Sequence, residues 1–192
     1  MTRPGSPAST SSSSLRALLA IALLASPARA DEWGAYELRI AALVTGTDVL
    51  TKTDNSIGFG PGLIVDGGRF IRPHEILAVH LAWTTFPDPA GNTSNLWEAH
   101  LFGEYRGGRW SAGVGLGVGV FRSTVPINYS YLISGNVEGS LDLVHWCNHA
   151  LSAVVDLSGF PFNPLYHTVV SGGHIPDRLV GATASLGLAY RY

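Results

Sequence analysis

Two histidines and two glutamates have spacings that could support chemistry. His80 precedes a polar connection centred near residue 90, and Glu98, His100 and Glu104 follow it. If the flanking stretches form a symmetric hairpin, the two imidazoles lie opposite each other, with the carboxylates on the same face. Two imidazoles and a carboxylate could bind a divalent metal, or the histidines could titrate as a pH-sensitive pair. A slip of one residue in the register would separate the imidazoles.

The same alternation gives these histidines further ionisable neighbours. In a closed sheet, the ionisable residues at alternate positions would point into the interior. These residues are Glu37, Arg39, His80, Glu98, His100, Glu104, Glu138, Asp142, Asp156 and Arg191. Buried charges must be paired, and a small barrel has room for little more than side chains. We therefore expect a network of charges and hydrogen bonds that fills and stiffens the interior, and we assign no metal and no cofactor.

Stretches in which apolar and polar residues alternate must position these groups. A period of two recurs along the chain, and no stretch beyond the N-terminal segment keeps a helical period of about 3.6. The alternating stretches cover residues 33–44, 57–65, 77–83, 97–105, 110–120, 131–143, 151–157 and 180–192. The sequence therefore predicts eight strands.

The connections between the predicted strands run long, short, long, short. The long ones cover residues 45–56, 84–95, 122–130 and 160–177, and the short ones cover 66–73, 106–109 and 145–149. Membrane barrels have short periplasmic turns, longer external loops and an even number of strands of about ten residues. We therefore predict an all-β fold, an eight-stranded antiparallel up-and-down transmembrane β-barrel with both chain ends on the periplasmic side.

The N-terminal segment has the pattern of an export signal. A positively charged region precedes the apolar core at 15–25, and residues 28–30 fit an A-x-A cleavage site. The apolar core is too short to span a bilayer as a helix, which needs about 20 residues. We predict that residues 1–30 are a cleaved signal peptide and that residues 31–192 form the barrel.

The charge balance excludes some partners and favours a membrane. The formal net charge is −2, and the predicted signal peptide holds three arginines and no acid, so the mature chain is more acidic. This argues against a nucleic-acid partner. Charged residues make up 14% of the chain, whereas a soluble domain carries about 25%.

The two faces of the predicted strands separate a membrane barrel from a soluble one. The apolar faces carry bulky aliphatic residues, with rings such as Trp83 and Trp110 at strand ends, and the opposite faces carry glycine, serine and isolated charges. A soluble, lipocalin-like barrel needs a charged exterior, and neither face here is charged enough to supply one. Aromatic residues at strand ends also suit the two membrane interfaces.

The chain ends on VGATASLGLAYRY, in which every second residue is apolar or aromatic. Together with the export signal and the eight amphipathic stretches, this ending resembles the small outer-membrane β-barrels of Gram-negative bacteria, of the OmpA, OmpX and OmpW type. The resemblance implies that Leu186, Leu188, Tyr190 and Tyr192 form an assembly signal read by the barrel assembly machinery. We expect a monomer in the outer membrane, in contact with its lipid and lipopolysaccharide.

Glycines alternate along two of the predicted strands, at positions 58, 60 and 62 and at 113, 115, 117 and 119. They could permit the sharp bend of a small barrel, or they could leave the lumen partly open for a small ligand or an acyl chain. Pro61 cannot donate a ladder hydrogen bond. It therefore marks a bulge, a strand end, or a lateral opening to the bilayer such as that of lipid A palmitoyltransferase-type barrels.

Two segments contain residues that could support an enzyme. The segment HWCN at 145–148 faintly resembles the His-x-Ser-Asn stretch of outer-membrane lipid A deacylases, with Cys147 where their nucleophilic serine lies. No glutamate follows at a matching distance, and the segment falls in a predicted periplasmic turn. His167, Ser171 and His174 could form a nucleophile–base pair in the last loop. We nevertheless predict that the protein is not an enzyme.

The last connection is the most distinctive external feature. Phe160, Phe162, Tyr166 and His167 are candidate contact residues there, because long loops on a rigid scaffold often bind partners. The alternative is a cap over the barrel mouth. We predict a non-enzymatic outer-membrane barrel that supports envelope integrity or binds through its surface loops. The alternative functions are a narrow channel for small hydrophobic molecules and a lipid A-modifying enzyme.

Overall fold

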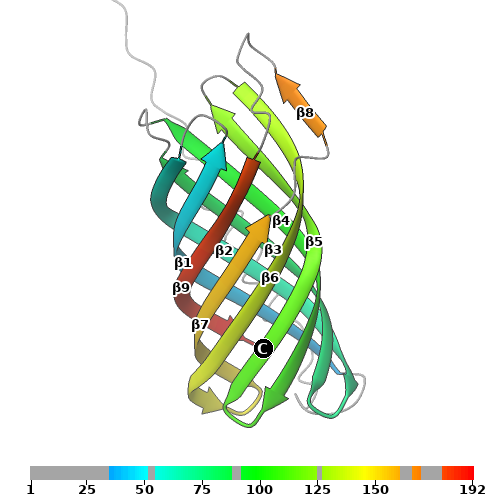
Figure 1. Ribbon diagram of the computed structural model, residues 1–192. Coiled ribbons are helices and arrows are strands. Elements are labelled where there is room, and N and C mark those ends of the chain that lie inside the picture. The colour runs from blue at the N-terminus through cyan, green and yellow to red at the C-terminus, as the bar shows by residue number, and fades with distance from the viewer. Residues whose placement is uncertain (1–34, 52–54, 88–91, 125–126, 161–165, 170–178) are drawn as a thin grey trace, which may run out of the picture.

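The computed structural model describes residues 35–51, 55–87, 92–124, 127–160, 166–169 and 179–192 (Figure 1). The predicted signal peptide and its cleavage site lie outside these residues. Within the described ranges the chain is almost entirely extended. The strands are β1 (Tyr36–Thr51), β2 (Asn55–Arg72), β3 (Glu75–Pro87), β4 (Thr93–Gly107), β5 (Trp110–Thr124), β6 (Ile127–Trp146), β7 (His149–Phe160), β8 (Tyr166–Val169) and β9 (Leu179–Arg191).

Eight of these strands close into one ring. Each strand from β1 to β6 pairs antiparallel with the next, and β9 pairs with both β7 and β1. The ring confirms the predicted eight-stranded up-and-down barrel, with β9 as the predicted C-terminal strand. The short strand β8 lies outside the ring, where it extends the pairing of β6 at the end of the barrel opposite the C-terminus (Figure 1). The predicted connection 160–177 therefore contains a strand that alternation did not reveal.

The strands at the long-connection end are longer than predicted. The sequence placed a connection at 45–56, but β1 continues to Thr51 and β2 begins at Asn55, so that Leu50 and Asn55 are register partners. Backbone ladders need no apolar side chains, so pairing continues where the alternation has become polar. Apolar periodicity thus locates the apolar band of a strand and underestimates its full length.

Side chains alternate strictly between the interior and the exterior. In β4 every even-numbered residue from Ser94 to Arg106 is buried, and the odd-numbered residues face outward. The outward face is apolar around the ring, and Leu101, Leu116 and Leu186 are all more than half exposed. An apolar exterior around a polar interior inverts the arrangement of a soluble barrel. Among the described residues, no helix is long and apolar enough to cross a membrane.

Tight turns join the strands at the end that holds the C-terminus. His74, Gly108 and Cys147 adopt positive φ angles of 72°, 66° and 53° in the three turns. The first and last strands are joined at the same end, because Leu38 and Tyr192 exchange backbone hydrogen bonds of 3.0 and 2.9 Å. The described chain therefore begins and ends at the short-turn end, as the alternation of connections predicts.

The inward glycines allow neighbouring groups to approach closely. A Cβ added to Gly117 would lie 1.9 Å from the carbonyl oxygen of Ala99, and one added to Gly113 would lie 2.2 Å from the ring of Phe102. The space beside these glycines is therefore already occupied, which favours the interpretation that they permit sharp curvature. Pro61 stays in the β1–β2 ladder without a bulge, and the β2–β3 pairing ends beside it at Gly62.

Candidate functional site

The interior of the barrel holds all ten ionisable residues of the predicted network. Every one of them is buried except Glu37, whose side chain is nevertheless only 8% exposed. The interior also holds Asn136 and two charged residues that the sequence did not place there, Asp66 and Arg106. Asp66 and Arg106 fell in predicted short connections, and one more step of the period-two count in each of β2 and β4 would have found them.

The central part of the network spans the lumen. Arg39 of β1 donates through Nε to Asp66 Oδ2 at 2.7 Å and through a second nitrogen to Glu138 Oε2 at 2.6 Å. A third bond joins the remaining nitrogen of the guanidinium to the other oxygen of Glu138. Because β6 is not a neighbour of β1 in the ring, the Arg39–Glu138 contact crosses the interior. A guanidinium shared by two carboxylates satisfies the rule that buried charges are paired.

The two predicted histidines lie in this central region. His80 and His100 are register partners on β3 and β4, as the symmetric hairpin predicts, with ring centroids 5.4 Å apart. His80 Nδ1 lies 2.7 Å from Asp66 Oδ1, and His100 Nε2 lies 2.8 Å from the Ser134 hydroxyl. Glu98 accepts a 2.8 Å hydrogen bond from Ser158.

The residues that could hold a metal differ from those expected. Within the described ranges, the acids and histidine whose ligand atoms all lie within 4.8 Å of one another are Asp66, His80 and Glu138. His100 is not a member, and Glu104 belongs to a different part of the network. Arg39 already binds both carboxylates of the group, so its guanidinium supplies the positive charge at this position.

A second ionic cluster lies near the short-turn end. Arg106 contacts Glu37 at 2.6 Å and Glu104 at 3.3 Å, and its guanidinium lies over the ring of Phe70. On the other side of the same region, Arg191 donates to Asp142 Oδ2 at 2.5 Å. Asp142 also accepts a 2.7 Å hydrogen bond from Ser152. Asp156, the remaining carboxylate of the network, accepts from Asn136 at 3.1 Å.

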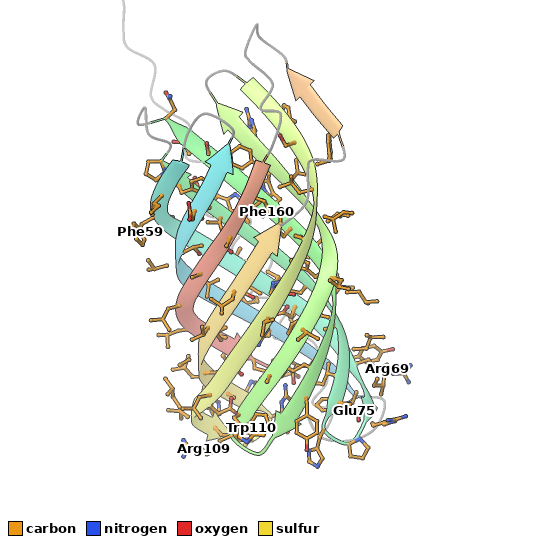
Figure 2. All side chains as sticks on the ribbon, viewed as in Figure 1. Phe59, Arg69, Glu75, Arg109, Trp110 and Phe160 are labelled. Carbon is orange, nitrogen blue, oxygen red and sulfur yellow. The ribbon has the colours of Figure 1, made fainter. Side chains whose placement is uncertain are left out.

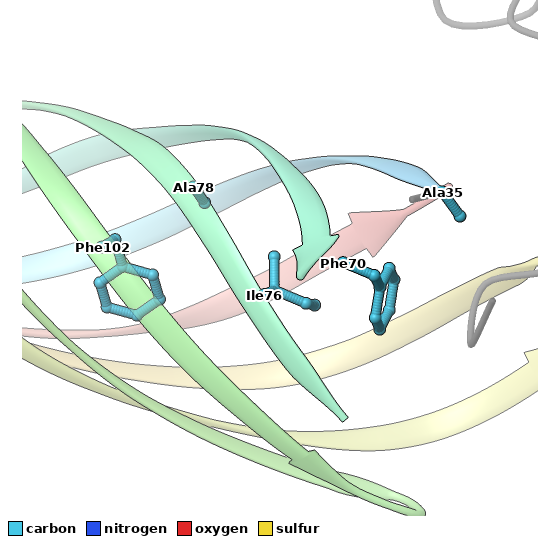
Figure 3. Close-up of a cluster of buried hydrophobic side chains, with 5 residues drawn as sticks. All are labelled: Ala35, Phe70, Ile76, Ala78 and Phe102. Atoms are coloured by element: carbon cyan, nitrogen blue, oxygen red, sulfur yellow. The ribbon is translucent and has the colours of Figure 1, made fainter. Parts of the chain in front are cut away.

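Apolar clusters fill the interior beyond these ionic groups. Near the short turns, Figure 3 shows Phe70, Ile76 and Phe102 converging with Ala35 and Ala78. Toward the long-connection end, the buried cluster consists of Phe86, Leu96, Leu132 and Phe160, with Phe121 packed against it. We call this second group the upper plug.

Phe160 was predicted to offer a surface contact, and the structure contradicts this placement. Its side chain is 0% exposed at the end of β7, inside the upper end of the barrel (Figure 2). The strand alternation continues to Phe160 and turns it inward, so this residue seals the interior. Phe162 lies outside the described residues. Tyr166 and His167 contribute their backbones to β8, and their side chains lie outside the description.

The predicted assembly signal occupies the outer face of β9. Leu186, Leu188 and Tyr190 are exposed on the exterior. The Tyr190 hydroxyl lies 2.6 Å from His149 Nδ1, and the ring of Tyr192 lies 5.0 Å from the His149 ring. The first residue of β7 is thus a histidine that contacts both terminal tyrosines.

The deacylase-like segment occupies the turn between β6 and β7. Cys147 is exposed there, at the same end of the barrel as the C-terminus. His145 Nε2 lies 2.9 Å from the Cys147 carbonyl oxygen, so the imidazole interacts with the turn backbone. His167, Ser171 and His174 lie where side chains are not described.

The fold is that of the small eight-stranded outer-membrane β-barrels. Neisserial surface protein A is similar with a TM-score of 0.50 and 12% identity, over 80% of this chain and 95% of that chain. Ail, the attachment invasion locus protein of Yersinia pestis, is similar with a TM-score of 0.49 and 15% identity, over 84% of this chain and 100% of that chain. OprG from Pseudomonas aeruginosa is similar with a TM-score of 0.45 and 10% identity, over 84% of this chain and 98% of that chain. Neither a protein-family model nor a curated protein sequence matches the chain.

Proposed function

We propose that this protein is a non-enzymatic outer-membrane barrel with a sealed interior, which acts through its outer surfaces. The observation that carries the proposal is the filling of the lumen. Arg39 and Glu138 join opposite walls through the centre, and the upper plug lies above them. A barrel of this size has little interior space to begin with, and these groups occupy it. Its contribution is then to envelope integrity or to binding at the long-connection end.

The apolar exterior supports the membrane location. Outward aliphatic residues continue around the ring, and burying such a belt in hydrocarbon is favourable at about 25 cal/mol per Å². Closing the ring pairs the edge strands β1 and β9, so the barrel presents no open sheet edge there to lipid. In this location the short turns face the periplasm, and β9 carries the signal for the assembly machinery.

The channel alternative lacks support at the glycines that suggested it. Gly117 is approached by the backbone of the neighbouring strand, and Gly113 by the ring of Phe102. The lipid A-modifying alternative would require an active group near the outer leaflet, but Cys147 lies in a short turn. The buried imidazoles of His80 and His100 contact other network residues. We therefore favour surface contact over transport or catalysis.

Reconstitution tests the sealed interior. Purified protein in planar lipid bilayers is expected to give no stepwise conductance, and vesicles that contain it should take up a small apolar dye no faster than empty vesicles. An open porin reconstituted in the same preparation serves as the positive control. Discrete conductance steps, or dye uptake that scales with the amount of this protein, would overturn the proposal.

A further inference from the structure

The two faces of the short-turn end differ in their balance of charge. Inside, the acids Glu37, Glu104 and Asp142 are paired with arginines and have side chains 8%, 5% and 3% exposed. Other arginines at the same end point outward, and the side chain of Arg72 is 73% exposed. Figure 2 shows Arg69 and Arg109 projecting from opposite sides of this end. Among the described residues on the outer surface of this end, arginines therefore outnumber acids, although the protein as a whole is acidic.

Aromatic residues place these arginines at the depth of lipid headgroups. Tyr36, Tyr105, Trp110 and Tyr190 are exposed on the exterior around the same end. Tyrosine and tryptophan favour the boundary between hydrocarbon and headgroups. The guanidinium of Arg69 lies 5.5 Å from the centre of the Tyr36 ring, which ties the charge to this level.

Arg72 and Arg109 keep donors for a further partner. Arg109 uses one nitrogen for the carbonyl oxygens of Asp142 and Leu143, at 3.0 and 3.1 Å, and a guanidinium carries five N–H groups. Arg72 contacts Glu75 at 3.4 Å, but both side chains are well exposed, and exposed ion pairs contribute little. Arginine is well suited to phosphate because two parallel donors match two phosphate oxygens.

We propose that Arg72 and Arg109, which we call the basic rim, bind the headgroups of anionic phospholipids. The inference rests on the proposed membrane location and adds a lipid class to it. The basic rim is continuous with the apolar belt through the exposed aromatic residues, so the phosphate of a bound lipid meets an arginine while its acyl chains lie on the belt. Other anionic partners would contact the charges without using the adjoining apolar surface.

Quenching by brominated lipids measures this preference directly. A variant that keeps Trp110, beside Arg109, as its only tryptophan is refolded into vesicles of phosphatidylcholine mixed with brominated phosphatidylglycerol or with brominated phosphatidylcholine. The ratio of quenching gives the relative binding constant of the anionic lipid at the rim. Wild-type protein, with all five tryptophans, is measured in the same way, so the test stands even if the single-tryptophan variant folds poorly.

The expected result is a preference for phosphatidylglycerol that high salt reduces. Each arginine removed in Arg72→Gln and Arg109→Gln should lower the relative binding constant about fivefold. Glu75→Gln should raise it, because it removes the acid beside Arg72. Arg122→Gln is the matched control, since Arg122 stacks on Tyr129 at the opposite end of the barrel.

Two outcomes contradict different parts of the reasoning. Equal quenching by both lipids, or a preference that the two substitutions leave unchanged, would overturn the basic rim and leave the membrane location intact. Quenching by neither lipid would instead contradict the membrane location itself.

Discussion

Replacing Arg39 with leucine tests how the interior is held together. Arg39 is 3% exposed and binds two carboxylates, of which Asp66 is 8% and Glu138 is 2% exposed. Removing the guanidinium leaves both acids buried without their cation. At an effective dielectric of about 20, each charge pair at roughly 4 Å is worth about 4 kcal/mol of attraction before desolvation is considered. Breaking a buried pair by removing one partner costs about 3–5 kcal/mol, and we expect Arg39→Leu to fall in this range.

The loss of stability comes from the two buried carboxylates that no longer have a cation, so neutralising both of them should reverse it. The triple variant Arg39→Leu, Asp66→Asn, Glu138→Gln has no buried charge left at this point and should recover most of the lost free energy of unfolding. Arg72→Leu is the control, because an exposed arginine should change the free energy of unfolding by less than about 0.5 kcal/mol.

Unfolding by urea in lipid vesicles gives these free energies, with the fraction folded followed by tryptophan fluorescence and by gel mobility. If Arg39→Leu lowers the free energy of unfolding no more than Arg72→Leu does, the buried ion pairs do not stabilise the barrel. If the triple variant is less stable than Arg39→Leu alone, the unpaired acids are not the origin of the lost stability.

Substitutions at three further places test other parts of the structure. Gly117→Ala should block folding, or lower the free energy of unfolding by more than about 1–3 kcal/mol, because its Cβ would lie 1.9 Å from a backbone oxygen. Gly103→Ala should be tolerated because no atom lies within 4 Å of the added Cβ, and equal folding yields of the two variants in vesicles would contradict this. Phe160→Ala should lower the free energy of unfolding by about 3–5 kcal/mol, and a neutral effect in urea would show that the upper plug does not pack as described. His149→Ala and Tyr190→Phe should each lower the free energy of unfolding by about 0.5–1.5 kcal/mol, because each removes the hydrogen bond between these two residues. Additive losses in the double variant would show that the two residues do not interact.

The sequence predicts the closed sheet and its two faces because both follow from a period of two. The register of His80 with His100 is predictable for the same reason, since a hairpin with a central connection pairs residues at equal distances from it. Asp66 was missed because a run of glycine and arginine after it resembles a turn, although β2 continues to Arg72. Alternation could not reveal this continuation because a paired backbone does not depend on side-chain polarity.

The choice of partners within the lumen required the structure. Arg39 and Glu138 are 99 residues apart in the chain and meet only because the ring is closed and tilted. The sequence predicted that buried charges would be paired, but it gave no reason for Glu104 to bind Arg106 rather than a histidine. Phe160 was assigned to a loop because prolines and an asparagine follow it, yet the strand pattern extends to this residue and determines its direction.

Gel mobility tests whether the barrel is closed with its apolar face in lipid. Protein from isolated outer membranes is compared with and without boiling in SDS, because a ring with all its strands paired resists SDS until it is heated. We expect a faster-migrating unboiled band from the outer-membrane fraction. Identical mobility in both lanes, with the protein recovered in the soluble periplasmic fraction, would show that the protein is not a membrane barrel.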